Sequence, residues 1–119
     1  MTVSINQSTD SRLIASGKVE GVHVYNRQGD RLGTINDIYI DKVSGQAEFA
    51  SLAFGGFLGA GQKLHSLPWS VLNYNTEMDG FVVDLDKKIL EKAPTYSHDE
   101  LAGSEANWTE KVRDYYAVA

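Results

Sequence analysis

LIASGKVEGVHVYNRQGDRLGTINDIYID, residues 13–41, alternates short apolar runs with residues that favour turns. Val22 and Val24 would share one face of a first strand, because side chains along a strand alternate between its two faces. The RQGD that follows is typical of a turn, in which Gly29 adopts a positive φ without strain. The stretch therefore predicts two strands, over residues 18–26 and 32–41, joined by a tight turn.

The second predicted strand, residues 32–41, does not fit a single alternating pattern. Ile38 and Ile40 fall on one face, whereas Ile35 falls on the opposite face. A β-bulge near 36–37 would bring the isoleucines onto one face, because a bulge inserts an extra residue into a strand. The sequence therefore predicts an irregular strand here.

Further elements follow along the chain. Residues 47–54 are apolar enough for a strand that is covered on both faces. Pro68 belongs at an edge or at the end of a strand, because it has no N–H to donate. Asp86 can cap a short helix, and Pro94 would end it. The other predicted elements are strands over 62–68 and 81–85, a helix over 86–93 and a C-terminal helix within 105–119. Short strands with helices only late in the chain predict a mainly β fold, either a small barrel or a sandwich.

Three stretches carry a resemblance to a known family: residues 13–41, SGQAEFASLAFGGFLGAGQKLHSLPWSVL at 44–72 and FVVDLDKKILEKAPTY at 81–96. Together they resemble the PRC-barrel family, which includes the cytoplasmic domain of the photosynthetic reaction-centre H subunit and the C-terminal domain of a ribosome-maturation factor. The tail with Trp108 and the Tyr115-Tyr116 pair resembles an extension found on free-standing bacterial members. The resemblance implies a small PRC-type β-barrel of about six strands with a short helix and a C-terminal helix. It also implies a protein-binding or assembly role more than an enzymatic one.

The expected domain organisation has three parts. Residues 1–12 are polar and are expected to form a mobile N-terminal arm. Residues 13–96 are expected to form the PRC barrel, and residues 97–119 a C-terminal helical extension. A chain of 119 residues is long enough to bury one core without metal or disulfides. It contains no cysteine, which excludes disulfides and thiolate chemistry.

Charge and hydropathy narrow the classes of partner and the location. The formal net charge is −5 and Lys and Arg do not cluster, so we expect no nucleic-acid binding, which depends on a basic surface. The longest uncharged run, residues 49–62, is shorter than the about 20 apolar residues of a transmembrane helix. No integral membrane segment is therefore expected. The first 12 residues lack the pattern of a signal peptide, and a cytoplasmic location is expected.

The glycine-rich stretch GGFLGAGQKL, residues 55–64, is a candidate phosphate-binding loop. Gly56 and Gly61 have the spacing of a P-loop, but Gln62 separates Gly61 from the lysine, and no serine or threonine follows that lysine. Several glycines close together are more typical of a long loop between two strands. The stretch therefore favours a connecting loop with apolar side chains on it.

Two further patterns bear on metal binding and catalysis. In NTEMDGFVVDLD, residues 75–86, the Asn, Glu, Asp, Gly and last Asp fall at positions 1, 3, 5, 6 and 12 of a calcium loop. The last position is not Glu and no helix precedes the loop, so a turn between strands is favoured, and a calcium site stays an alternative. His23, His65 and His98 are scattered, and the chain has no nucleophile motif. We expect no enzyme, no cofactor and no metal site.

The functional hypothesis is a non-enzymatic PRC-barrel protein that acts in protein-protein interaction or assembly. Clusters of exposed apolar side chains mark interfaces, and symmetric dimers are the commonest result. We expect a homodimer or a dimer of dimers, together with an unidentified protein partner. The candidate interface residues are Phe54, Phe57, Leu58, Trp108, Tyr115 and Tyr116.

Three alternatives stay open. Trp108 would pack the C-terminal helix onto the barrel, and this helix would then cap its own barrel and leave a monomer. A small-ligand or metal-binding module would use the mouth of the barrel and the acidic turn at 75–86. A ribosome-assembly factor would bind a basic ribosomal protein, which the acidic net charge permits.

Overall fold

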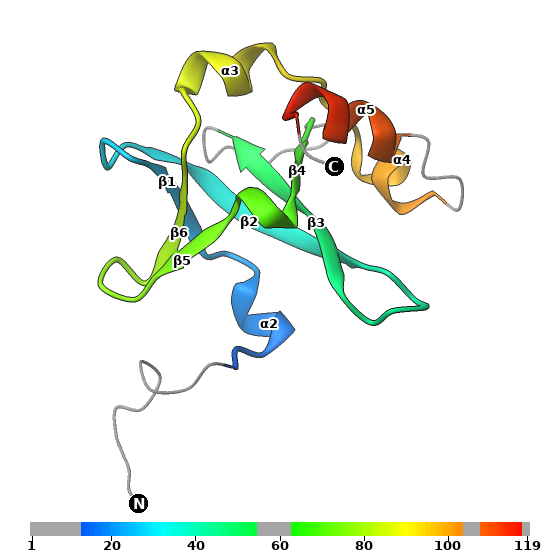
Figure 1. Cartoon of the computed structure of the whole chain (residues 1–119), viewed down its shortest axis with the longest axis horizontal. Coiled ribbons are helices and arrows are strands. Elements are labelled where there is room, and N and C mark those ends of the chain that lie inside the picture. Colours follow the sequence, from blue (N-terminus) through cyan, green and yellow to red (C-terminus); the bar gives the residue numbers. More distant parts are fainter. Residues whose placement is uncertain (1–12, 55–62, 104–107, 118–119) are drawn as a thin grey trace, which may run out of the picture.

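The computed structural model describes residues 13–54, 63–103 and 108–117. Six strands form one curled sheet in the order β4-β3-β2-β1-β6-β5 (Figure 1). Neighbouring strands are antiparallel, except for β1 and β6, which are parallel. The predicted fold class, mainly β with a small six-stranded barrel, a short helix and a C-terminal helix, is confirmed. The strands are β1 (His23–Asn26), β2 (Arg31–Ile40), β3 (Ala47–Phe54), β4 (His65–Pro68), β5 (Asn73–Asn75) and β6 (Gly80–Val83).

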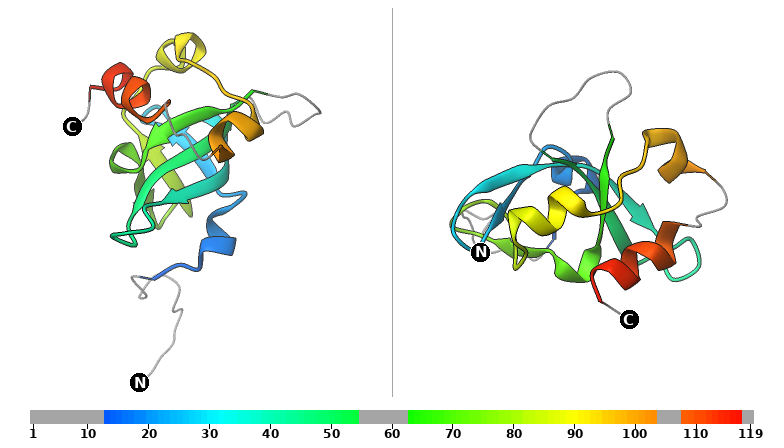
Figure 2. Two further views of the ribbon diagram at one scale, coloured as in Figure 1. Left: turned by 90° about the vertical axis from the view of Figure 1, so that its right-hand side faces the viewer. Right: turned by 90° about the horizontal axis from the view of Figure 1, so that it is seen from above.

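Short helices flank the sheet at its two ends. In Figure 1 and in the left view of Figure 2, α3 and α5 lie towards the top of the sheet, and α2 lies below the sheet. The C-terminal helix and the helix after β6 were both predicted, whereas α2, α4 and β5 were not. The helices are α2 (Ser16–Val19), the 3-10 helix η1 (Trp69–Val71), α3 (Lys87–Lys92), α4 (His98–Ala102) and α5 (Trp108–Tyr115).

The N-terminal boundary of the first strand differs from the prediction. Residues 18–19 were expected to begin a strand, but they belong to α2. Gly21 has φ of 85°, which separates this helical turn from β1 because glycine adopts positive φ readily. Val19 is buried against the interior of the sheet. The first strand therefore begins at His23, five residues later than predicted.

The predicted bulge in β2 is present. The register with β3 shifts between Ile35 and Asp37, so the extra residue changes which face the following side chains occupy. Ile35 and Ile38 consequently both pack into the interior of the sheet. A second irregularity lies between Tyr39 and Ile40, and Ile40 is 54% exposed. The expectation that all three isoleucines would be buried was wrong for Ile40.

Both faces of β3 are buried, as its apolar sequence predicted. Ala50 and Leu52 pack inside the curled sheet, and Phe49 and Ala53 pack on its outer face. The interior cluster consists of Val19, Val24, Leu32, Ile35, Ala50, Leu52, Leu67, Leu72, Phe81, Val83 and Leu90. The outer cluster consists of Phe49, Ala53, Leu64, Leu101, Trp108 and Val112. The C-terminal helices thus supply the second layer over β3.

Gly33 of β2 lies where two neighbouring strands approach closely. It pairs with Val24 of β1 and with Phe54 of β3. A Cβ at this position would overlap the Ala53 carbonyl oxygen and would lie 3.0 Å from the Ala53 carbonyl carbon. Its φ is not positive. Glycine is therefore needed here for space, and not for an unusual backbone conformation.

The ends of two helices test the predicted capping. Asp86 is the N-cap residue of α3, but its side chain makes no capping hydrogen bond, so that prediction was wrong in its mechanism. Helix α4 has a capping box that was not predicted. The Glu100 N–H donates to Ser97 Oγ at 3.1 Å, and the Ser97 N–H donates to Glu100 Oε1 at 2.7 Å. These two bonds fix the start of α4 after the barrel.

Candidate functional site

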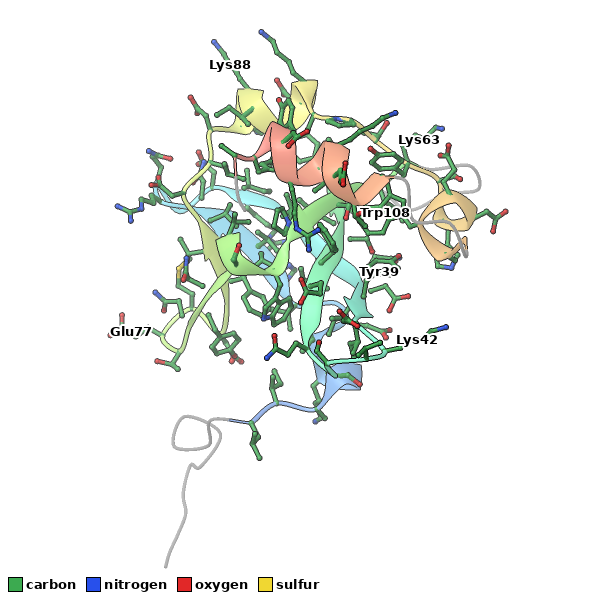
Figure 3. All side chains as sticks on the ribbon, turned by 45° about the vertical axis from the view of Figure 1, so that its right-hand side comes forward. Tyr39, Lys42, Lys63, Glu77, Lys88 and Trp108 are labelled. Carbon is green, nitrogen blue, oxygen red and sulfur yellow. The ribbon has the colours of Figure 1, made fainter. Side chains whose placement is uncertain are left out.

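The C-terminal extension packs on the outer face of the sheet through Trp108. This side chain is 6% exposed, and its ring stands edge-on to Phe49 of β3, with 4.8 Å between ring centroids. It also stands edge-on to Tyr39 of β2 at 5.6 Å, and Figure 3 shows these two side chains next to each other. The third aromatic neighbour is Tyr96, at 6.2 Å. Such edge-to-face pairs add to the burial of apolar area, so Trp108 anchors α5.

A charged pair orients the same helix. Arg113 Nη2 of α5 donates to Glu48 Oε1 of β3 at 3.0 Å. The guanidinium also lies over the ring of Phe49, 4.8 Å from its centroid. Both charged side chains are about one-third exposed, so the ion pair contributes about 0.2–1 kcal/mol. The pair therefore fixes the direction of α5 more than it stabilises the fold.

A layer of buried polar groups lies between the sheet and the C-terminal extension. Ser51 and Ser66 are direct cross-strand partners on β3 and β4, and both are buried. Six buried polar atoms of this layer make no hydrogen bond of normal geometry among the described residues, although the Tyr39 and Ser51 hydroxyls lie close enough to interact with each other: the hydroxyls of Tyr39, Ser51, Ser66, Tyr96 and Tyr116, and Trp108 Nε1. We call these six side chains the hydroxyl layer. Buried polar groups are normally hydrogen-bonded, so the hydroxyl layer requires an explanation.

The tyrosines of the hydroxyl layer remain protonated. Burial raises the pKa of Tyr39, and the Ser51 hydroxyl beside it offsets part of this effect. Burial also raises the pKa of Tyr96, with a further contribution from the negative charge of Glu100. Burial raises the pKa of Tyr116 far above its ordinary value. These hydroxyls therefore act as hydrogen-bond donors and acceptors and do not supply a base at neutral pH.

A second surface lies where α3 meets α5, beyond the end of the barrel. Ile89 of α3 is 41% exposed and Tyr115 of α5 is 38% exposed. The Tyr115 hydroxyl donates to the Ile89 carbonyl oxygen at 2.6 Å, which joins the two helices. The ring of Tyr115 stands edge-on to Tyr116, at 4.9 Å. We call Ile89 and Tyr115 the exposed patch.

The sequence profile of the PRC-barrel domain matches residues 12–90. The chain belongs to the PRC-barrel family. Its fold is also similar to that of a solved structure assigned as a 16S ribosomal RNA processing protein, RimM, from Pseudomonas aeruginosa, with 17% sequence identity and a TM-score of 0.45. This match covers 71% of the present chain and 50% of the other, so the chain spans about half the length of that protein. No match was found among curated proteins.

The six predicted interface residues lie in different places in this PRC barrel. Phe57 and Leu58 lie outside the described residues. Trp108 is buried within its own chain, as the alternative of helix packing required. Phe54 is partly buried against the interior cluster, and Tyr116 contacts both clusters. Tyr115 alone among the four described candidates is a large exposed side chain, and its role in an interface stays a prediction.

The acidic turn at 75–80 joins β5 to β6 of the PRC barrel. Asn75 Oδ1 accepts a hydrogen bond from the Met78 N–H at 2.9 Å, and Asp79 accepts one from the Tyr74 hydroxyl. Asp79 has φ of 55°, a conformation that Asp tolerates in turns. Over residues 13–54, 63–103 and 108–117, no group of three His, Cys, Asp or Glu side chains is placed to hold a metal ion. Asn75 and Asp79 thus both take part in hydrogen bonds within the turn itself.

Sequence reasoning missed several residues of these surfaces. Ile89 and Glu48 become important only through contacts with a helix far along the chain. Tyr96 reaches the outer cluster because its backbone forms a bridge with Leu64, next to β4. Among these contacts, only the part of Arg113 could have been recognised locally, because Arg113 follows Val112 on the helix that carries Trp108. In the described part of the chain, no helix is both long and apolar enough to cross a bilayer.

His65 is a buried titratable group inside the PRC barrel. Its ring stands edge-on to Phe54 at 5.3 Å, and its Nδ1 has no hydrogen-bond partner within the described ranges. Burial lowers its pKa, so the folded state binds a proton less readily than the unfolded chain. We therefore expect stability to decrease as the pH falls below about 6.5, the ordinary pKa of histidine. The decrease ends once the pH is below the folded pKa, and urea unfolding at several pH values measures it.

The variant His65→Leu checks this assignment. Leucine has a similar volume but binds no proton, so this variant should lose the part of the pH dependence that His65 causes. His98→Leu in α4 is the matched control, because the side chain of His98 is exposed. An unchanged pH dependence in His65→Leu would show that another group is responsible.

Proposed function

We propose that this PRC barrel is a non-enzymatic protein that binds other proteins and self-associates as a homodimer or a dimer of dimers. The observation that carries the proposal is the exposed patch of Ile89 and Tyr115. Two large exposed side chains from separate helices lie there, joined by the bond from the Tyr115 hydroxyl to the Ile89 backbone, and clusters of exposed apolar side chains mark interfaces. A patch of this kind meets its own copy across a two-fold axis in the commonest oligomers.

The geometry of Tyr115 favours binding. Its hydroxyl is held by the Ile89 carbonyl and its ring by Tyr116, so the side chain has lost much of its freedom before a partner arrives. A preordered side chain costs less entropy on association. Tyrosine is also enriched among the residues that contribute most to interfaces. Tyr115 is therefore the proposed anchor of the contact.

The chemistry of the chain narrows the second partner. The net charge of −5 favours a basic protein as the second partner and disfavours direct contact with nucleic acid. Ribosomal proteins are one class of basic protein. A role in ribosome assembly, by binding a basic ribosomal protein, is therefore a more specific version of this proposal. We also propose that the protein is cytoplasmic. Its proposed domain organisation is an N-terminal arm at residues 1–12, the barrel at 13–96 and a C-terminal extension at 97–119.

Sedimentation equilibrium tests the self-association. The double variant Ile89→Ser, Tyr115→Ser should dissociate the oligomer into monomers and leave the barrel folded, because both side chains are exposed. Val43→Ser is the matched control, since Val43 is exposed in the turn between β2 and β3, away from the patch. The control should keep the oligomer intact.

Two results would contradict the proposal. An unmodified chain that stays monomeric at concentrations of about tens of micromolar forms no stable dimer. An oligomer that the double variant leaves unchanged must use a surface other than Ile89 and Tyr115. Circular dichroism of each variant confirms that the fold is retained.

A further inference from the structure

The hydroxyl layer sets the contact beneath the C-terminal extension apart from the interior of the barrel. Eight buried polar side-chain atoms lack a hydrogen-bond partner within the described residues, and six of them belong to this layer. The interior cluster is made of apolar side chains, and the buried His65 lies beside it against Phe54. Ser51 and Ser66 face the extension, because their neighbours Ala50, Leu52 and Leu67 point into the interior. The contact of the extension with the sheet is therefore partly apolar and partly polar, and the polar atoms of Ser66, Tyr96, Trp108 and Tyr116 in it have no hydrogen-bond partner among the described residues.

This composition lowers the cost of lifting α5 from the sheet. Separation would expose the apolar side chains Trp108 and Val112 to water, which is unfavourable. It would also give water to the hydroxyls of Ser66, Tyr96 and Tyr116 and to the Trp108 indole N–H, which have no hydrogen-bond partner among the described residues, and this is favourable. The two effects oppose each other. A helix docked over a dry apolar face has no such compensation.

We propose that α5 is a displaceable cover, and that the face of β2, β3 and β4 beneath it binds a basic amphipathic helix of another protein. The proposal rests on the protein-binding role proposed above, but it uses a different surface from the exposed patch. Helix-in-groove binding is a common form of recognition in which apolar side chains at helical spacing enter a groove. Here the groove is already occupied by the chain's own helix.

The contacts of α5 define the chemistry of the incoming helix. Trp108 fills the space between three aromatic rings, Val112 lies one turn further along, and Arg113 pairs with Glu48. A competing helix needs a large aromatic side chain, an apolar side chain four positions later and a cation at the following position. The Arg113 guanidinium also lies over the ring of Phe49, and a neutral side chain at this position would lose that cation–π interaction. Further donors and acceptors on that helix would satisfy the hydroxyl layer.

A labelled peptide of residues 105–119 of this chain is the probe, measured by fluorescence anisotropy against the full chain. The docked α5 competes with the peptide, so the unmodified chain should bind it weakly. The full-length variant Trp108→Ala should bind it about ten-fold more tightly, because apparent affinity rises with the fraction of molecules whose face is free. A peptide that carries Trp108→Ala is the matched control and should not bind.

A charge exchange shows that the peptide occupies the place of α5. Adding Glu48→Arg to the Trp108→Ala chain should weaken binding of the native peptide about ten-fold, since it opposes Arg113. A peptide with Arg113→Glu should then restore the affinity. Restoration by the exchanged pair supports the proposed face, and loss without restoration overturns it.

Hydrogen exchange on the unmodified chain covers the case in which Trp108→Ala does not fold. Amides of α5 should exchange at least about ten-fold faster than those of β3, because the cover opens while the sheet stays intact. Equal protection of α5 and β3 would overturn the proposal. So would a folded Trp108→Ala chain that does not bind the peptide.

Measuring the oligomeric state together with peptide binding separates a failure of this inference from a failure of the proposed dimer. A monomeric chain that binds the peptide leaves this inference standing and refutes only the proposed dimer. If the peptide instead converts an unmodified dimer into monomers, a second copy's helix occupies the face. That result overturns the assignment to a helix of another protein.

Discussion

The variant Gly33→Ala is expected to destabilise the barrel by about 1–3 kcal/mol, the usual cost of forcing an extra carbon into a packed site. The added Cβ would overlap the carbonyl oxygen of Ala53, which belongs to the neighbouring strand and cannot rotate away as a side chain can. Strands β2 and β3 would have to separate where their ladder is continuous. A fall in the melting temperature, measured by calorimetry, is the expected observation.

Gly17→Ala is the matched control for this prediction. Gly17 lies in α2, and a Cβ at that position would have no neighbour within 4 Å. Alanine is preferred to glycine in a helix by about 0.5–1 kcal/mol, so this variant should be unchanged or slightly more stable. If both variants melt at the same temperature as the unmodified chain, the close approach at Gly33 is not a constraint on the fold.

The variant Leu52→Ala is expected to cost about 2–5 kcal/mol, the range for removing a fully buried leucine side chain. Leu52 is 0% exposed, and it lies on the inner face of β3. Its removal leaves a cavity in the interior cluster, and the rigid strands on either side cannot close it completely. Urea unfolding should show a lower midpoint with an unchanged slope.

Ile40→Ala is the control that tests the register of β2. Ile40 is exposed in the structure, so its truncation should change the stability by less than about 0.5 kcal/mol. A strand without the second irregularity would bury Ile40 together with Ile38. A large loss of stability in Ile40→Ala would therefore contradict the register between Tyr39 and Ile40.

Local patterns in the sequence were sufficient to predict the central strands of the sheet. Residues 47–54 were recognised as a doubly covered strand because, apart from Glu48 and Ser51, their side chains are apolar, so that neither face suits exposure to water. The bulge near 36–37 followed from a mismatch within a single strand, which can be read without knowing its neighbours. Gly29 was also recognised, since its turn needs a positive φ.

The missed features depend on contacts between distant segments. Strand β5 has only three residues, two of them exposed, and it exists because it pairs with β6. Ile40 has the same side chain as Ile35, but a shift in register decides which of them is buried. Helix α4 had a readable signal in the spacing of Ser97 and Glu100, which was overlooked.

The candidate site was predicted in the same uneven way. Trp108 was expected to pack the C-terminal helix onto the barrel, and it does so together with Val112. The receiving face was not predictable, because Ser51 and Ser66 become neighbours only through strand pairing. The patch at Ile89 was also missed, since an exposed isoleucine becomes significant only when Tyr115 lies beside it.

The parallel pairing of β1 with β6 has a consequence for how the chain folds during synthesis. Val24 pairs with Phe81, whereas β1, β2 and β3 pair with their neighbours in sequence. A nascent chain can form the early hairpins as they leave the ribosome, but β1 keeps one open edge until residue 83 has been made. Long-range pairing of this kind slows folding because the intervening loop must first close. The open edge of β1 is therefore available for pairing with other chains, and so for aggregation, until β6 has been made.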